Sequence, residues 1–227
     1  MSGKPSIQVP QLENGDRLTR SEFERRYQAM PHLKKAELVE GVVYVASPVR
    51  IASHGRPHAQ IITLLGAYSA ATPGVDLADN ATVRLDLDNE PQPDALLRLE
   101  PKAGGKSRIS EDDYVEGAPE LMVEVAASSA SYDLNDKLKA YRRNGVQEYL
   151  VWQMNDNRLD WFSLSEGRYI SLDPDTAGII RSQVFPGLWL AVTALLNGDL
   201  AKVLVELQKG LETDEHQAFV ERLKSYH

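Results

Sequence analysis

Apolar and polar residues alternate with two different periods along the chain, and these periods predict both strands and helices. Apolar residues at helical spacing predict helices over residues 19–30, 58–71 and 133–144, and again over three short segments after residue 191. Short apolar or alternating runs bounded by turn residues predict strands at 36–39, 42–45, 74–79, 82–88, 95–99, 121–127, 147–153, 159–164, 168–172 and 179–184. Mixed strands and helices of this kind predict an α+β protein.

The apolar run at residues 121–127, LMVEVAA, contains one charged residue. Because side chains alternate along a strand, Leu121, Val123 and Val125 share one face. Glu124 then lies on the other face, between Met122 and Ala126. Burying an unpaired carboxylate costs several kcal/mol or more, so Glu124 must meet a cation, a metal ion or a proton.

A second acid and a lysine stand near this strand in the predicted arrangement. Asp94 follows Pro93 and opens the strand ALLRL, and Lys137 lies on the helix that follows Glu124. Carboxylates on neighbouring strands can converge on one divalent cation. An ammonium there can steady a phosphate or an attacking hydroxide. The alternative is two acids at strand edges and a lysine on the surface.

These stretches resemble the Uma-two family of restriction-endonuclease-like proteins in the PD-(D/E)xK nuclease superfamily. The resemblance is carried by AELVEGVVYVASP (36–48), QPDALLRL (92–99), the segment 114–152 and FPGLWLAVTALLNGDL (185–200). It implies that Pro93 and Asp94 are the PD pair, Glu124 the strand acid and Lys137 the lysine. The superfamily usually places this lysine two residues after the strand acid, where Ala126 stands. The implied fold is a restriction-endonuclease-like core with a central mixed β-sheet flanked by helices, followed by extra C-terminal helices.

Three further residues are accessory candidates. Glu37 lies on the first predicted strand, where the family typically has an acid, and it faces either the metal pocket or solvent. His58 begins a helix and either serves the chemistry as a phosphate ligand or proton carrier, or hydrogen-bonds to backbone. Tyr141 lies four residues after Lys137, on the same helix face.

The composition limits the class of protein. The chain has 227 residues and no cysteine, which excludes disulfides and thiolate zinc sites. Its net charge of −8 argues against strong non-specific binding to DNA. A glycine-lysine segment offers Lys102, Lys106 and Arg108 as contacts to a DNA backbone, with a solvated surface as the alternative.

The organisation along the chain predicts three parts. Residues 1–17 form a polar N-terminal segment expected to be disordered, 18–187 the nuclease-like core, and 188–227 a helical extension that packs on the core or in a homodimer. No apolar run approaches the roughly 20 residues that span a membrane. We expect no membrane association, no signal peptide and a cytoplasmic location.

These observations give hypotheses from different functional classes. The first is an endonuclease that hydrolyses DNA phosphodiester bonds with Mg²⁺ or Mn²⁺, in which Asp94 and Glu124 bind the metal and Lys137 acts on the attacking water. The second is a catalytically inactive binding or assembly module with the nuclease fold. A third is hydrolysis of another phosphodiester, such as RNA or a nucleotide.

Overall fold

A six-stranded mixed sheet forms the centre of the protein in the computed structural model, which describes residues 9–46, 50–127 and 129–225. The strand order across the sheet is β11 (Arg168–Ser171), β10 (Arg158–Ser165), β9 (Glu148–Gln153), β8 (Leu121–Ala126), β5 (Ala95–Leu99) and β3 (Val75–Asp79). Strands β8 and β9 pair in parallel, and every other neighbouring pair is antiparallel. The predicted α+β class with a central mixed sheet is confirmed.

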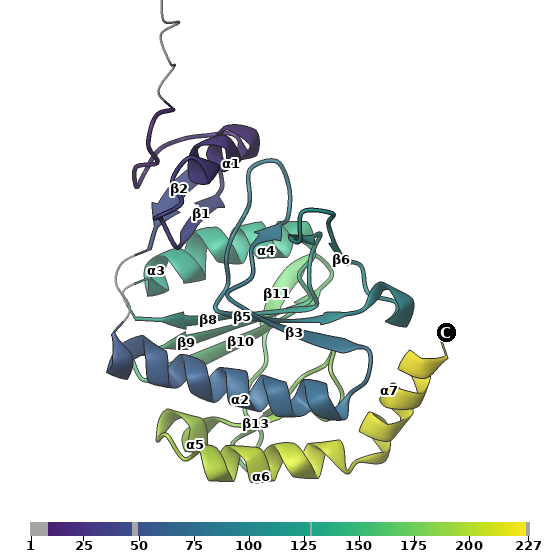
Figure 1. Ribbon diagram of the computed structural model, residues 1–227. Helices are drawn as coiled ribbons and strands as arrows, with labels where there is room; N and C mark the ends of the chain where they lie inside the picture. Colours follow the sequence, from purple (N-terminus) through teal and green to yellow (C-terminus); the bar gives the residue numbers. More distant parts are fainter. Residues whose placement is uncertain (1–8, 47–49, 128, 226–227) are drawn as a thin grey trace, which may run out of the picture.

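Helices cover both faces of this sheet (Figure 1). One face carries α2 (Arg56–Ala71), below which lie α5 (Val192–Leu196) and α6 (Leu200–Leu211), and α7 (Asp214–Lys224) follows α6 at the side. The other face carries a continuous helical segment of α3 (Ala130–Tyr132), η3 (Asp133–Lys137) and α4 (Leu138–Asn144). This segment is the crossover that a parallel β8–β9 pair requires. Its middle part, η3, has π-helical hydrogen bonding.

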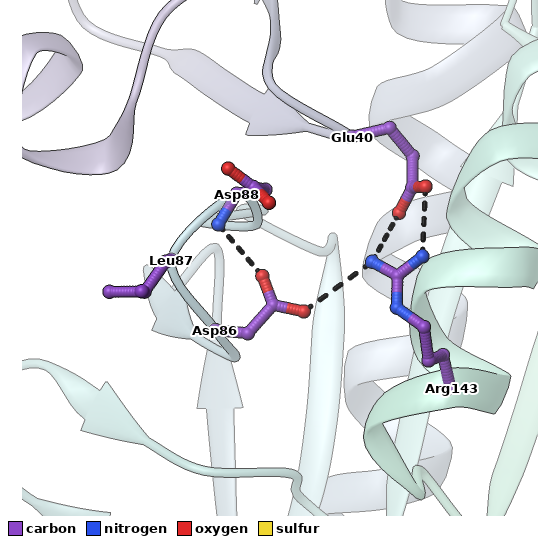
Figure 2. Close-up of a pocket in the computed structure, with 5 residues that line it drawn as sticks. All are labelled: Glu40, Asp86, Leu87, Asp88 and Arg143. Atoms are coloured by element: carbon purple, nitrogen blue, oxygen red, sulfur yellow. Dashed lines mark hydrogen bonds and ion pairs between the residues drawn. The ribbon is translucent and has the colours of Figure 1, made fainter.

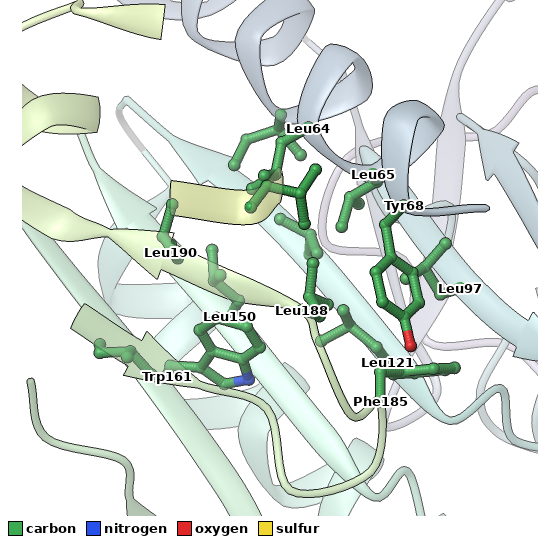
Figure 3. Packing of buried hydrophobic residues seen from close by; sticks show 14 of the residues in the cluster. Leu64, Leu65, Tyr68, Leu97, Leu121, Leu150, Trp161, Phe185, Leu188 and Leu190 are labelled. Carbon is green, nitrogen blue, oxygen red and sulfur yellow. The ribbon is translucent and has the colours of Figure 1, made fainter. Parts of the chain in front are cut away.

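The alternation in β8 sorts its side chains onto two cores. Leu121, Val123 and Val125 join the larger core, which packs α2 and the C-terminal segment against the sheet (Figure 3). Met122 and Ala126 join a second core under α4. Every residue of β8 is buried, including Glu124. The predicted division of this strand into two faces is therefore confirmed.

A small N-terminal layer has its own apolar cluster, formed by Leu12, Phe23, Met30, Ala36, Leu38 and Val43. It consists of α1 (Arg20–Gln28) and the hairpin β1 (Ala36–Val39) and β2 (Val42–Val45). The predicted hairpin turn is confirmed, with positive φ at Glu40 and Gly41. Residues 1–8 of the segment expected to be disordered lie outside the described residues, whereas Leu12 is buried and ties the following part to this layer.

The predicted strand over residues 82–88 is wrong beyond Arg84. Only β4 (Val83–Arg84) forms, beside β7 (Val115–Glu116) and β6 (Arg108–Ile109). The Asp86 carboxylate accepts hydrogen bonds from the Asp88 amide and the Asn89 side chain, and these local bonds close a turn in place of a ladder. Leu87, in this turn, is 74% exposed.

The C-terminal segment packs on the core through its apolar stripes. The strand pair β12 (Ile179–Arg181) and β13 (Trp189–Ala191) leads into α5 and α6, and Val203, Leu207 and Phe219 belong to the larger core. Two short helical turns complete the fold, η1 (Ile51–Gly55) and η2 (Pro101–Ala103). No helix in the described part of the chain is long and apolar enough to cross a membrane.

Candidate active site

A cleft of about 960 Å³ is lined by residues of the hairpin β1–β2, the start of α2, strand β8 and the crossover helices. We call it the acidic cleft. The ionisable side chains that line it are Lys35, Glu37, Arg50, His54, His58, Asp94, Tyr44, Glu124, Tyr132, Asp133 and Lys137. Several segments far apart in the sequence therefore contribute charge to one place. All three predicted principal residues, Asp94, Glu124 and Lys137, line this cleft.

Glu124 contacts two residues of the crossover helices. Its Oε1 accepts a hydrogen bond from Lys137 Nζ at 2.8 Å and another from the Tyr141 hydroxyl at 3.0 Å. Lys137 and Tyr141 are one helical turn apart, so a single helix face presents both donors. The cation that a carboxylate buried in this strand requires is therefore the ammonium of Lys137.

Lys137 lies among more than one carboxylate. Its Nζ is 2.9 Å from Glu37 Oε1 and 3.5 Å from Asp133 Oδ1, and its side chain is only 2% exposed. Burial alone lowers the pKa of Lys137, but Glu124, Glu37 and Asp133 together raise it well above the usual value for lysine. The ammonium thus stays charged.

One ammonium cannot neutralise the surrounding carboxylates completely. Burial raises the pKa of Glu124 well above its ordinary value, against the lowering effect of Lys137, and Asp133 and Asp94 raise it further. Burial also raises the pKa of Asp133. The cluster therefore has an excess of acid, which a proton or an added cation would relieve.

Asp94 has a separate set of partners. Its Oδ1 lies 3.2 Å from Lys35 Nζ, and its Oδ2 lies 3.2 Å from His54 Nε2 and accepts a hydrogen bond from the Val125 amide at 2.8 Å. Burial opposes ionisation, but the His54 contact and the Lys35 charge outweigh it and lower the pKa of Asp94 below its ordinary value. Asp94 is therefore ionised.

The strand register brings the two acids together. Ala95 faces Val123 in the β5–β8 ladder, so Asp94 lies beside Glu124, and its carboxylate reaches the next amide of β8. The two carboxylates nevertheless pair with different lysines, Asp94 with Lys35 and Glu124 with Lys137. Within the described ranges no three His, Asp or Glu side chains are placed to hold a metal ion between them.

The donors still suit a magnesium-like ion. Mg²⁺ takes oxygen ligands and commonly uses one or two carboxylates, completing its shell with water and substrate phosphate. Asp94 and Glu124 supply two such carboxylates in one cleft, and the excess of acid leaves room for added positive charge. The residues present therefore fit a hard divalent cation without a preformed cage of three side chains.

Of the two roles predicted for His58, the structure has the hydrogen bond to backbone. Its Nε2 lies 2.8 Å from the Asp94 carbonyl oxygen and 3.0 Å from Asp79 Oδ1. It therefore fixes the start of β5 and does not touch the Asp94 carboxylate. His54, one helical turn earlier, is the histidine that does.

Sequence reasoning missed Lys35 and Asp133 as members of the cleft. Lys35 stands beside Lys34 just before a strand, a pattern typical of surface lysines, and Asp133 stands at a predicted helix start, where aspartate commonly caps. Asp133 lies four residues before Lys137, and this spacing was the signal in the sequence that the two side chains share a helix face. Lys102, Lys106 and Arg108 lie after the far end of β5 and do not line the acidic cleft.

A second, smaller pocket lies beside the hairpin turn (Figure 2). In it the guanidinium of Arg143, from α4, donates to both carboxylate oxygens of Glu40 at 2.9 and 2.7 Å. Arg143 also lies 3.5 Å from Asp86. This ion pair connects the hairpin that carries Glu37 to the helix that carries Tyr141.

A known protein family matches most of the chain. Residues 20–193 match the model of the Uma2 family, described as "Putative restriction endonuclease". The chain belongs to the Uma2 family. This confirms the resemblance drawn from the sequence, and the matched range contains every charged residue that lines the acidic cleft. Helices α6 and α7 lie beyond it.

A solved structure has the same fold as this Uma2 chain. It is the crystal structure of "a putative nuclease belonging to DUF820" from Anabaena variabilis, with a TM-score of 0.57 and 11% sequence identity, over 77% of this chain and 97% of the other. At this identity the likeness concerns the fold alone. No curated protein matched the chain.

Proposed function

We propose that this Uma2 protein is an endonuclease that hydrolyses DNA phosphodiester bonds with Mg²⁺ or Mn²⁺. The observation that carries the proposal is the meeting of Asp94, Glu124 and Lys137 in one cleft, with Lys137 Nζ 2.8 Å from Glu124. Family membership supports nuclease chemistry, and the oxygen donors support a hard divalent cation.

In this mechanism Asp94 and Glu124 would hold the cation, and Glu37 would be the accessory carboxylate. A bound cation supplies positive charge that polarises the scissile phosphate. Lys137 donates hydrogen bonds to the attacking water and orients it. Tyr141 holds Glu124 by its hydroxyl, so the carboxylate keeps one orientation. The buried site restricts water, which strengthens these electrostatic contacts.

One observation favours a second candidate, a nuclease-fold module without catalysis. Lys137 pairs with Glu124 and Lys35 pairs with Asp94, so both principal acids have a cation from the chain itself. A site of this kind holds together without a metal ion. Calorimetric titration with Mn²⁺ separates the two candidates, because only the nuclease binds the ion through Glu124.

The test of the proposal combines binding with cleavage. Purified protein with Mg²⁺ or Mn²⁺ is assayed on plasmid, duplex and single-stranded DNA, and on RNA, alongside the variants Asp94→Asn and Glu124→Gln. We expect cleavage of DNA and a loss of about 100-fold or more in each variant. Asp88→Asn, in the turn beside β4, is the matched control and keeps full activity. The proposal would be overturned if calorimetry detects no heat of Mn²⁺ binding and the protein either cuts no substrate or cuts without a metal ion.

Cutting both strands of a duplex in one encounter takes two active sites. We therefore also propose that the active species on duplex DNA is a homodimer. Light scattering of the purified protein, with and without a DNA duplex, measures the mass directly, and a monomer throughout would contradict this part.

A further inference from the structure

Asp133 is the one acid of the cleft that the proposed mechanism does not use. Its side chain is 2% exposed and lines the cleft, and its Oδ1 lies 3.5 Å from Lys137 Nζ. Its other oxygen, Oδ2, is buried without a hydrogen bond of ordinary geometry in the part of the chain that the structure describes, although the Ser129 hydroxyl is close enough to the carboxyl group to lower its pKa. A buried carboxylate oxygen without a partner is costly and requires an explanation.

The position of Lys137 explains why Asp133 has an oxygen without a partner. Its two shortest contacts go to Glu124 and Glu37, which are the proposed principal and accessory ligands of the cation. Both Lys137 and Tyr141 already donate to the same oxygen, Glu124 Oε1. A divalent cation taking that carboxylate would repel the ammonium, because like charges a few ångströms apart interact strongly in a buried site.

Asp133 is placed to keep the ammonium in the cleft when this happens. It lies one turn before Lys137 on the π-helical segment η3. The helix backbone therefore keeps the two residues near each other whatever Glu124 binds. Unusual π-helical turns inside helices frequently mark functional sites. The unpartnered Oδ2 can accept a donor from Lys137 after a small change of rotamer.

We infer that Asp133 is a positioning residue that retains Lys137 in the cleft once a divalent cation occupies Glu124. This inference rests on the proposed function, since it presumes a cation at Glu124. The matched control is Asp136, three residues further along the same segment, which is partly exposed and pairs with Lys139 at 3.7 Å.

The test measures the position of Lys137 and not turnover. An amine-acetylating reagent labels the full chain with and without saturating Mn²⁺, and peptide mass spectrometry quantifies acetylation at Lys137. In the wild type and in Asp136→Asn we expect protection in both states. In Asp133→Asn we expect Mn²⁺ to increase labelling of Lys137 by about fivefold or more, since the charge-assisted contact is lost. Asp133→Glu, which keeps the carboxylate, should restore protection.

The outcomes separate the two proposals. If calorimetry detects Mn²⁺ binding and Lys137 in Asp133→Asn stays as protected as in the wild type, the inference about Asp133 is overturned and the proposed nuclease stands. If Mn²⁺ does not bind the wild type, the proposed function fails, and the inference fails with it. If Asp133→Asn increases the labelling of Lys137 by the same amount with and without Mn²⁺, the inference is also overturned, because the role of Asp133 would then be structural. Thermal melting of each variant establishes that it is folded.

Discussion

Lys35 Nζ lies 3.2 Å from Asp94 Oδ1, so a lysine directly before β1 occupies the place beside a carboxylate that the proposed mechanism gives to a metal ion. The Lys35 side chain is 25% exposed and also contacts the Asn80 side chain at 3.2 Å. Lys35 and an incoming cation therefore compete for Asp94.

The first prediction follows from this competition. Lys35→Met should raise the affinity for Mn²⁺ by roughly five- to tenfold, which corresponds to about 1–1.4 kcal/mol for a partly exposed pair. Calorimetric titration at low ionic strength measures the change. Lys34→Met, which removes the neighbouring exposed lysine, serves as control and should leave the affinity unchanged. Weaker binding in Lys35→Met would show that Lys35 helps to assemble the metal site.

The second prediction concerns pH and lies outside the cleft. Burial, with the neighbouring Glu24 carboxylate, raises the pKa of Glu90 to about 8 from an ordinary 4.5, although Arg84 opposes the shift. A raised pKa in the folded state means that the contribution to stability is complete below pH 4.5 and is lost as the pH rises through 8.

Glu90→Gln, which mimics the protonated acid, should therefore match the wild type near pH 4.5 and be the more stable protein above pH 8. Urea denaturation across this range gives the difference in the free energy of unfolding. Asp88→Asn is the control for an acid on the same loop and should show no such trend. A difference that does not grow between pH 4.5 and 8 would contradict the assignment.

The third prediction compares two glycines inside helices. Alanine favours a helix over glycine by about 1 kcal/mol, so propensity predicts that both substitutions stabilise. A Cβ on Gly66 of α2 would make an ordinary contact of 3.6 Å with Leu77, and Gly66→Ala should be neutral or stabilising. A Cβ on Gly210 of α6 would collide with the Gly187 backbone and lie 2.8 Å from Trp189 Cγ.

Gly210→Ala should therefore lose about 1–3 kcal/mol of stability through overpacking. For a chain of this size that lowers the melting temperature by roughly 2–4 °C per kcal/mol. Thermal unfolding of the two variants under one set of conditions tests the contrast. Equal melting temperatures would mean that α6 does not approach β13 as closely as described.

The fourth prediction concerns the bidentate pair in Figure 2. Glu40→Arg and Arg143→Glu each place like charges together and should each destabilise the protein, whereas the double variant should recover most of the loss. Because the Arg143 side chain is 50% exposed, we expect a coupling energy of only about 0.5–1 kcal/mol, reduced by salt. A double-mutant cycle in urea at two salt concentrations measures it, and complete additivity would rule out a role for the pair.

The sequence predicted the sheet and the position of Glu124 well, because a charge inside a fully buried strand leaves few places for its partner. The alternating pattern failed at residues 82–88, where Asp86 and Asn89 close a local turn that the period of two does not record. Lys35 and Asp133 were missed because their contacts depend on how the hairpin and the crossover helices meet. No spacing along the chain encodes the meeting of Lys35 and Asp94, which are 59 residues apart.

The N-terminal layer has its own apolar cluster and yet supplies Lys35 and Glu37 to the cleft. A small cluster of this kind opens more readily than the cores of the sheet. On heating, the hairpin will separate first and take those two side chains with it, while Asp94 and Glu124 remain on an intact sheet. We expect the proposed nuclease activity to be lost before the circular-dichroism signal of the sheet.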